Sequence, residues 1–445
     1  MSEVVLKAMS ARKAALKLAN VSAKDKNSAL LEIASAILKN KGALLAANHK
    51  DLKAAEGLLT KGRISQAFFQ RLKLTEDKLR NVAEMVQSVA GLEDPVGRTL
   101  YAMELDRDLE LYKVSCPIGV IGAIFEARPD VLPQISSLCL KSGNAVVLKG
   151  GKEAKNSNEA FFETIREVSE KSGIPYGWIQ LIEARREVKE LLKLDDLIDL
   201  LVPRGNKDFV RYIQANTNIP VLGHAEGLCH IYVDSDADVK KAVEICYDAK
   251  VQYPAVCNAV ETILVHKAIA DLFLEPLGKR FQEAGVEIRG DERTRKILSW
   301  AKPATEKDWR TEYLDLIISI KVVGGVQEAI DHINTYGSKH TDAIVTENKM
   351  TALHFLSEVD SSSVMLNAST RFSDGYRYGL GAEVGISTGK VHARGPVGLE
   401  GLTTSKFYLI GKGQVVTDYV GSQAKPFTHR PLSKKWLDVK RASER

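Results

Sequence analysis

Apolar positions in the first part of the chain recur at helical spacing. Leu30, Ile33 and Ile37 fall on one face of a predicted helix, and similar spacing continues to about residue 92. From residue 100 to 114, apolar and polar positions alternate on both sides of a polar turn at 106–108, which predicts a β-hairpin. A hairpin that projects ahead of the core is a candidate oligomer contact, although a plain surface ribbon fits the pattern equally well.

Beyond residue 117, short apolar runs alternate with helical patterns. These runs are predicted strands at 118–125, 145–148, 178–182, 197–202, 230–234, 317–323, 342–346 and 362–366. Unbroken apolar runs are typical of strands buried on both faces of a parallel sheet. Their alternation with helices predicts a doubly wound α/β fold, in which ligands collect at the carboxyl ends of the strands.

The composition is that of a soluble globular protein. Of 445 residues, 44% are hydrophobic and 27% are charged. The formal charge of +5 comes from 62 basic and 57 acidic residues without a long basic run, which disfavours nucleic-acid binding. No apolar run is long enough to span a membrane, and residues 1–19 lack the apolar core of a signal peptide, although their basic, amphipathic character leaves a transit peptide open. Five cysteines without tight pairing fit a reducing compartment, so we expect a cytoplasmic protein.

The stretch 253–262 contains a candidate nucleophile, Cys257. A helical pattern precedes it and a strand pattern at 262–265 follows it. Pro254 disfavours helix at Tyr253, so the helix should stop there and leave Cys257 on a short connection that presents the thiol to a cleft. The competing interpretation is a small buried hydrophobic residue, which is the commoner fate of a lone cysteine.

Other signatures of ligand binding are weak. Lys149 follows a predicted strand, where a lysine reaches a ribose or phosphate, but the spacing of a phosphate loop is missing and no GxGxxG follows the first core strand. A solvated surface lysine is the alternative. His224, Cys229 and His230 lack a second cluster at ligand spacing, so we predict no metal site.

Several longer motifs resemble a known family. They are Pro117-Ile-Gly-Val-Ile-Gly122, Phe125-Glu-Ala-Arg-Pro129, Tyr253-Pro-Ala-Val-Cys257-Asn-Ala, His340-Thr-Asp-Ala-Ile-Val-Thr-Glu347, and Asn367-Ala-Ser-Thr-Arg371-Phe through Gly385-Ile-Ser-Thr. The chain resembles the aldehyde dehydrogenase superfamily and, more narrowly, the glutamate-5-semialdehyde dehydrogenases, also called γ-glutamyl phosphate reductases, from about residue 11 to 416. The resemblance implies an aldehyde-dehydrogenase-like α/β fold with a Rossmann-type cofactor domain, an α/β catalytic domain and a small oligomerisation hairpin.

The resemblance also implies a division of the chain. The expected parts are an N-terminal helical part of the cofactor domain (1–99), the oligomerisation hairpin (100–115), the NADP(H)-binding α/β domain (116–224), the catalytic α/β domain (225–390), and a C-terminal segment returning to the cofactor domain and the oligomerisation element (391–445).

The family's reaction assigns a role to Cys257. Members reduce L-glutamyl 5-phosphate with NADPH to L-glutamate 5-semialdehyde and phosphate, the second step of proline biosynthesis from glutamate. By resemblance, Cys257 attacks the acyl phosphate as a thiolate, and hydride then reduces the resulting thioester. The backbone N–H of Cys257 is the expected oxyanion donor.

Three departures from ordinary aldehyde dehydrogenases agree with this chemistry. His224 stands where those enzymes carry the glutamate that activates water, so the thioester is spared hydrolysis. Arg128 stands at the position of the oxyanion asparagine, where a guanidinium stabilises an oxyanion or holds phosphate, with a structural ion pair as the alternative. Lys152 replaces a glutamate that binds the ribose of NAD, which favours NADP(H) unless the lysine is merely exposed.

Further candidate roles come from local position and from the resemblance. Arg204 and Gly205 open a helix that meets the cofactor pyrophosphate, and Glu312 matches a glutamate that binds the nicotinamide ribose. The candidates for substrate binding are Asn258, Asn367, Ser369 and Arg371. Stabilisation of the loop by asparagine and serine side chains is the alternative for the last three.

Three other functions stay open at this point. A general NAD(P) aldehyde dehydrogenase keeps the fold, although His224 argues against it. A papain-like thiol hydrolase with Cys257 and a histidine, and a non-catalytic scaffold, are the other two. We expect a homodimer or higher homo-oligomer, built by the hairpin and the C-terminal segment. Because an acyl phosphate is labile in water, we also expect contact with a glutamate 5-kinase.

Overall fold

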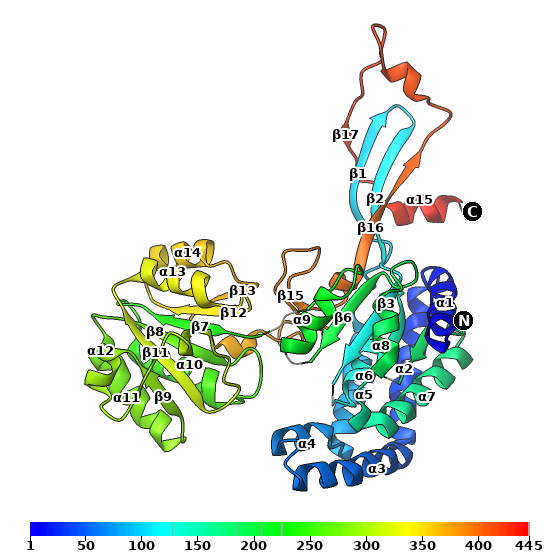
Figure 1. Cartoon of the computed structure of the whole chain (residues 1–445). Coiled ribbons are helices and arrows are strands. Elements are labelled where there is room, and N and C mark those ends of the chain that lie inside the picture. The colour runs from blue at the N-terminus through cyan, green and yellow to red at the C-terminus, as the bar shows by residue number, and fades with distance from the viewer. Residues whose placement is uncertain (127, 184, 206, 224–225, 444–445) are drawn as a thin grey trace.

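Two α/β lobes and a projecting arm make up the molecule (Figure 1). The computed structural model of this chain describes residues 1–126, 128–183, 185–205, 207–223 and 226–443. The chain begins with the helices α1 (Glu3–Leu18), α2 (Ala23–Lys39), α3 (Lys41–Thr60), α4 (Gln66–Leu72) and α5 (Glu76–Gly91). Leu30, Ile33 and Ile37 are buried on α2, as their spacing predicts, because that face packs against the first lobe.

The first lobe, which we call the cofactor lobe, has a parallel sheet in the order β5-β4-β3-β6. Its strands are β3 (Val120–Phe125), β4 (Ala145–Lys149), β5 (Ile179–Leu181) and β6 (Leu200–Arg204), and its helices are α6 (Val131–Lys141), α7 (Lys155–Lys171), α8 (Arg185–Leu191) and α9 (Lys207–Ala215). Helices α2, α5, α6 and α7 pack into the core on one face, and α1, α8 and α9 into the core on the other. The doubly wound arrangement predicted from the sequence is confirmed.

The second lobe, the catalytic lobe, has a seven-stranded parallel sheet in the order β10-β9-β11-β8-β7-β12-β13. The strands are β7 (Cys229–Val233), β8 (Val260–His266), β9 (Glu287–Gly290), β10 (Lys302–Pro303), β11 (Ile317–Val323), β12 (Thr341–Val345) and β13 (Ser363–Leu366), with helices α10 (Val239–Val251), α11 (Ala270–Glu283), α12 (Glu292–Ile297), α13 (Val326–Tyr336) and α14 (Lys349–Glu358). The predicted strands agree with β7, β8, β11, β12 and β13. The short strands β9 and β10, at one side of the sheet, leave no periodic pattern in the sequence.

The arm is an antiparallel sheet in the order β16-β2-β1-β17. The predicted hairpin is confirmed as β1 (Thr99–Asp106) and β2 (Leu109–Pro117), and β16 (Thr403–Ile410) and β17 (Arg430–Pro431) join it from the C-terminal part of the chain. Helix α15 (Trp436–Ser443) covers one face, where Trp436 stacks on Tyr408 at 4.1 Å between ring centroids.

The chain re-enters the cofactor lobe before it reaches the arm. It forms the small ribbon β14 (Gly385–Ser387) and β15 (Gly395–Val397). Side chains beside this ribbon enter the core of the cofactor lobe, namely Ala382, Val384, Val397, Leu399 and Leu402. The catalytic lobe is therefore an insertion between two parts of the cofactor lobe, and the return begins near residue 382.

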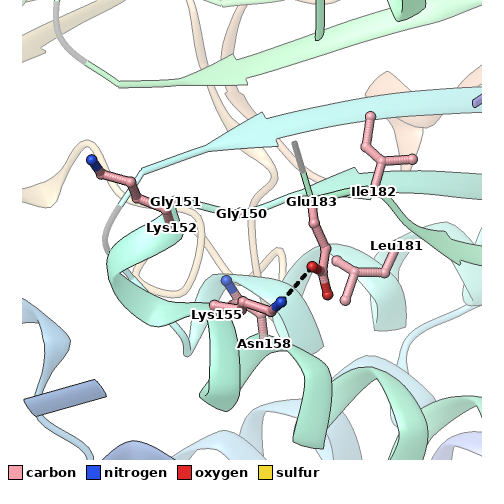
Figure 2. A pocket seen from close by; sticks show the side chains of 8 residues that line it. All are labelled: Gly150, Gly151, Lys152, Lys155, Asn158, Leu181, Ile182 and Glu183. Atoms are coloured by element: carbon pink, nitrogen blue, oxygen red, sulfur yellow. Dashed lines mark ion pairs between the residues drawn. The ribbon is translucent and has the colours of Figure 1, made fainter. Parts of the chain in front are cut away.

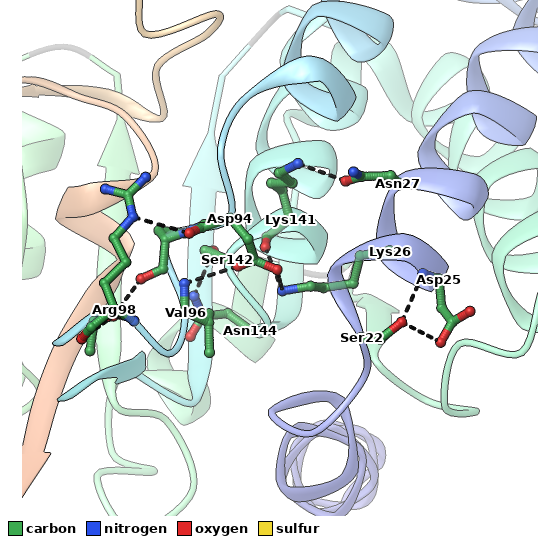
Figure 3. A network of polar contacts seen from close by, with 12 residues as sticks. Ser22, Asp25, Lys26, Asn27, Asp94, Val96, Arg98, Lys141, Ser142 and Asn144 are labelled. Carbon is green, nitrogen blue, oxygen red and sulfur yellow. Dashed lines mark hydrogen bonds and ion pairs between the residues drawn. The ribbon is translucent and has the colours of Figure 1, made fainter. Parts of the chain in front are cut away.

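Two buried lysines fasten the helices to the base of the arm (Figure 3). Lys26 of α2 pairs with Asp94 at 2.7 Å and donates to the carbonyl oxygen of Lys141 at 3.0 Å. Lys141 donates in turn to the side chain of Asn27 at 2.6 Å, and burial lowers the pKa of Lys141. Arg98, at the start of the arm, donates to the backbone oxygen of Asp94. Because an unpaired buried charge is costly, this network fixes where the arm leaves the lobe.

Within the described residues, every helix is too short or too polar to cross a lipid bilayer.

Candidate active site

Cys257 lies on a turn between a helix and a strand of the catalytic lobe. Helix α10 ends at Val251 and β8 begins at Val260, so the helix stops just ahead of Pro254 as predicted. Cys257 is half-buried, whereas Cys139, Cys229 and Cys246 are buried. Its thiol is therefore not one of the chain's core cysteines.

Two neighbouring segments hold the backbone of this turn. The thiol of Cys229 donates to the carbonyl oxygen of Cys257 at 3.2 Å. Gly227 lies so close that a Cβ atom there would be 1.9 Å from the same carbonyl oxygen, so only glycine fits. The N–H of Gly227 donates to Glu312 at 2.8 Å. A third contact comes from the N-terminal helices, where Arg71 of α4 donates to the carbonyl of Ala255 at 3.3 Å.

Positive charge from both lobes lies within electrostatic range of Cys257. Burial lowers the pKa of Arg204, at the end of β6, while Glu383 and the charge of Cys257 oppose that shift and Arg128 adds to it. Burial likewise lowers the pKa of Arg371, and the charge of Cys257 again opposes the shift. Guanidinium groups so placed attract anionic substrates.

The loop that carries Arg371 is tied to the turn of Cys257. Arg371 donates through Nε to Gln252 at 3.0 Å, just before the turn. Asn258 donates to the carbonyl oxygen of Ser373 at 2.8 Å, just after Arg371. Ser369 accepts the N–H of Arg371 and begins the short helix Thr370–Phe372. These contacts hold the guanidinium of Arg371 near Cys257.

Asn367 supports the same loop from its other end. Its φ of +51° places it in the left-handed region, which asparagine tolerates better than most residues. Its carboxamide accepts from the N–H of Thr346 and donates to the carbonyl of Thr346, both at 2.9 Å. This is the loop-stabilising role that the sequence left open as the alternative to substrate binding.

A second site lies at the carboxyl ends of β4 and β5, where a cavity of about 190 Å³ opens (Figure 2). It is lined by Gly150, Gly151, Lys152, Lys155, Asn158, Leu181, Ile182 and Glu183. Lys149 ends β4 beside it and donates to the carbonyl of Gly150 at 2.6 Å. Lys155 and Glu183 pair at 2.7 Å in this cavity, and Lys152 points away from that pair. A cavity at this edge of a doubly wound sheet is where nucleotides bind.

Comparison with known proteins identifies the arrangement. Residues 2–296 match the aldehyde dehydrogenase family. The gamma-glutamyl phosphate reductase of Natronomonas pharaonis is 58% identical over 427 residues, covering 96% of this chain and 97% of that protein. The crystal structure of gamma-glutamyl phosphate reductase from Thermotoga maritima matches with a TM-score of 0.89 at 42% identity, covering 93% of this chain and 100% of the other. This chain belongs to the aldehyde dehydrogenase family.

Within that family it belongs to the gamma-glutamyl phosphate reductases, since relatives of that name match it at high identity over nearly their whole length. An engineered glycolyl-CoA reductase solved with bound NADP⁺ shares the fold alone, with a TM-score of 0.63 at 15% identity over 91% of this chain and 96% of its own. The resemblance seen in the sequence motifs is confirmed, and so is the aldehyde-dehydrogenase-like fold.

The family's other expected positions fall in different places. Gly205 follows β6, and a Cβ atom there would lie 2.7 Å from Phe209 and 3.0 Å from Glu126. Arg204 donates to Gln134 at 3.2 Å and lies in range of Cys257, and its place at the cofactor pyrophosphate stays a prediction. His224, expected at the water-activating position, lies outside the described residues.

Sequence reasoning missed several residues around the site. Glu383, Gln134 and Gln252 contact or face the arginines, yet each stands alone in the sequence without a motif. The Lys155–Glu183 pair joins the start of α7 to the end of β5, and only the order of the sheet brings them together. The signal available was position, since both follow predicted strands at the edge where ligands collect.

Proposed function

We propose that this chain reduces L-glutamyl 5-phosphate to L-glutamate 5-semialdehyde and phosphate, with NADPH as the hydride donor, in the second step of proline biosynthesis. The observation that carries the proposal is the half-buried thiol of Cys257 with Arg204 and Arg371 in electrostatic range. L-Glutamyl 5-phosphate bears negative charge at its phosphate and at its α-carboxylate, so two cationic groups beside one nucleophile suit it. The relatives named gamma-glutamyl phosphate reductase support the same reaction.

The residues at the cavity of the cofactor lobe fit a nicotinamide dinucleotide. Gly150 and Gly151 line the cavity without side chains, and Gly205 is proposed at the pyrophosphate because it precedes the first turn of α9. In the proposal, Lys149 meets the ribose, Lys152 reads the 2′-phosphate and Glu312 takes the nicotinamide ribose. When bound, NADPH supplies hydride to the acyl carbon of the substrate.

The residues of the chain perform the remaining chemistry in this proposal. The Cys257 thiolate attacks the acyl carbon, so a carbon–sulfur bond forms and the bond to the phosphate oxygen breaks, releasing phosphate. After hydride transfer the carbon–sulfur bond breaks, its electron pair returns to Cys257 and the aldehyde leaves. The N–H of Cys257 and the guanidinium of Arg128 stabilise the negative oxygen at both stages. Arg204 holds the departing phosphate.

Arg371 is the group best suited to the substrate's α-carboxylate, because its guanidinium is held near Cys257 by Gln252. Asn258 and Ser369 then act by fixing the two loops around the substrate, since each bonds to backbone of the loop that carries Arg371. Asn367 supports that loop from Thr346. The role of His224, which replaces the water-activating glutamate of ordinary aldehyde dehydrogenases, is proposed from the resemblance in sequence alone.

The reverse reaction tests the proposal without a labile substrate. Enzyme, NADP⁺ and glutamate semialdehyde are mixed with and without phosphate, and the absorbance of reduced cofactor is followed. Reduction that requires phosphate supports an acyl-phosphate reductase. Reduction without phosphate would instead assign a hydrolytic aldehyde dehydrogenase, and no reduction with a reactive Cys257 would favour a thiol hydrolase.

We further propose a homo-oligomer built through the arm. On β16, Phe407 and Leu409 are 62% and 56% exposed, and their alternate positions place both on one face of the strand, where a second subunit would cover them. All five cysteines are free thiols, which fits a reducing compartment such as the cytoplasm.

Contact with a glutamate 5-kinase is proposed from the lability of the acyl phosphate. The test compares the flux through the two coupled reactions when the enzymes are mixed and when a membrane permeable to the intermediate separates them. Equal flux would contradict the need for contact.

A further inference from the structure

An ion pair with no access to solvent flanks the turn of Cys257. Lys250 is in the last turn of α10 and Glu261 is the second residue of β8, so one precedes the turn and the other follows it. Their side chains are 0% and 1% exposed, and Nζ lies 2.8 Å from Oε2. Burial lowers the pKa of Lys250 and raises the pKa of Glu261 to about 7. A buried ion pair is rarely more stabilising than apolar side chains of the same size, so stability alone gives little reason for it.

The second carboxylate oxygen of Glu261 reaches a different segment. Oε1 accepts the N–H of Leu314 at 3.2 Å. Leu314 has a φ of +53°, a conformation that is unfavourable for leucine and needs support from its surroundings. It lies two residues after Glu312, so Glu261 holds the loop that carries the proposed ligand of the nicotinamide ribose.

The contacts close into a ring, which we call the Glu261 ring. Glu312 accepts the N–H of Gly227, and Gly227 packs on the carbonyl of Cys257. Cys257 is joined to Glu261 by three intervening residues of chain, and Glu261 returns to the Glu312 loop through Leu314. The nucleophile and the proposed cofactor ligand are thus connected through two separate routes.

We propose that Glu261 is a positioning residue that couples occupancy of the cofactor site at Glu312 to the placement of Cys257. The inference rests on the proposed function, because it takes Glu312 as a cofactor ligand. When Glu312 turns to the cofactor, the loop that it shares with Leu314 moves, and Leu314 is displaced relative to the carboxylate of Glu261. Glu261 is fixed by Lys250 and cannot move into solvent, so the displacement passes back along its own backbone to the Cys257 turn, which ends where β8 begins.

Two double variants isolate the hydrogen bond to Leu314. Lys250→Met/Glu261→Gln removes both buried charges and keeps an acceptor for the Leu314 N–H. Lys250→Met/Glu261→Leu removes the same charges and the acceptor. Should the second variant fail to fold, Lys250→Met/Glu261→Met replaces it, because methionine has the length of glutamine without its oxygen.

The measurement is the rate at which iodoacetamide alkylates Cys257, followed by mass spectrometry of the peptide, with and without NADPH. Cys116, a half-buried cysteine on β2, serves as an internal reference that general loosening of the fold would accelerate. We expect NADPH to change the Cys257 rate roughly five- to tenfold in the parent and in the glutamine variant. In the leucine variant the factor should fall to about one, with Cys116 unchanged.

If NADPH changes the Cys257 alkylation rate of the leucine variant as much as that of the parent, the inference is overturned. Loss of this rate change in both variants would also overturn it, because the effect would then depend on the buried charges. NADPH affinity, measured from cofactor fluorescence, separates the two levels of proposal. A parent that binds no NADPH contradicts the proposed function. A parent that binds NADPH normally but shows the same factor as the leucine variant contradicts only the role of Glu261.

Discussion

The thiol of Cys229 donates a hydrogen bond to the carbonyl oxygen of Cys257 over 3.2 Å. Burial raises the pKa of Cys229 well above its ordinary value, so this thiol keeps its proton and remains a donor at neutral pH. Nδ1 of His340 lies 3.7 Å from the same sulfur. One cysteine of the chain therefore orients the backbone of another.

Removing this donor should weaken catalysis more than folding. We expect Cys229→Ala to lower the single-turnover rate roughly fivefold, the effect of about 1 kcal/mol, because the Cys257 turn loses a fixed point. Cys229→Ser keeps a donor and should retain most of the rate. Equal rates for the two variants at matched thermal stability would show that the bond has no part in placing Cys257.

Replacing the nucleophile should separate chemistry from binding. Cys257→Ser is expected to abolish turnover and to leave the dissociation constant of NADPH nearly unchanged, because serine is a far weaker nucleophile at neutral pH. Rates come from the phosphate-dependent assay and binding from cofactor fluorescence. Cys116→Ser is the control, since Cys116 lies on the arm, and it should behave as the parent. Activity retained by Cys257→Ser would remove the covalent mechanism.

The choice between NADPH and NADH should depend on Lys152. Lys152→Glu places a carboxylate at the rim of the cavity, where it repels a 2′-phosphate and accepts hydrogen bonds from the ribose hydroxyls of NADH. The ratio of kcat/KM for the two cofactors should move toward NADH by roughly tenfold or more, about 1.4 kcal/mol. Lys171→Glu makes the same charge change at the exposed far end of α7 and should leave the ratio alone. An unchanged ratio in Lys152→Glu would direct attention to Lys155, which faces Glu183 in the same cavity.

Acid should weaken the attachment of the C-terminal segment at Asp360. Hydrogen bonds from Lys390, Lys339 and Arg394 lower the pKa of this carboxyl well below its usual value, although burial opposes them. A lowered pKa means that Asp360 stabilises the fold above the unfolded value near 3.8 and that this contribution fades as the pH falls below it. Asp360→Asn should therefore lower the free energy of unfolding by roughly 1–2 kcal/mol at pH 7, with the difference from the parent shrinking below about pH 4. Thermal unfolding of both proteins from pH 3 to 7 measures this, and a constant difference across the range would contradict it.

The sequence predicted those parts of the structure whose cause is local. The strand Ile317–Val323 was predicted with the observed bounds because isoleucine and valine, which make up five of its seven residues, favour strands. The turn of Cys257 was predicted because Pro254 acts on the residue beside it. The resemblance to the aldehyde dehydrogenase family then supplied the arrangement of the lobes.

Other features depend on contacts that no local pattern records. Lys250 and Glu261 carry charges, which usually mark surface positions, yet the sheet and α10 enclose both. The contact of Arg204 with Gln134, and its electrostatic range to Cys257 in the other lobe, likewise left no pattern in the sequence. Such placements depend on how the two lobes pack against each other. Contacts between segments far apart in the chain leave no pattern in any short stretch of a single sequence.

The insertion of the catalytic lobe has a consequence for synthesis of the chain. All seven strands of that lobe lie between Cys229 and Leu366, so its sheet is complete once that stretch has left the ribosome. The strand that pairs with β2 and the last side chains of the cofactor-lobe core belong to residues 382–410, which are synthesised later. At ribosomal speed, the outer edge of β2 waits for β16 through roughly 290 residues, or about 15–60 s. A nascent chain from which residues up to about 370 have emerged would therefore carry a finished nucleophile lobe beside an unfinished cofactor lobe, and the arm would be the last part of the molecule to close.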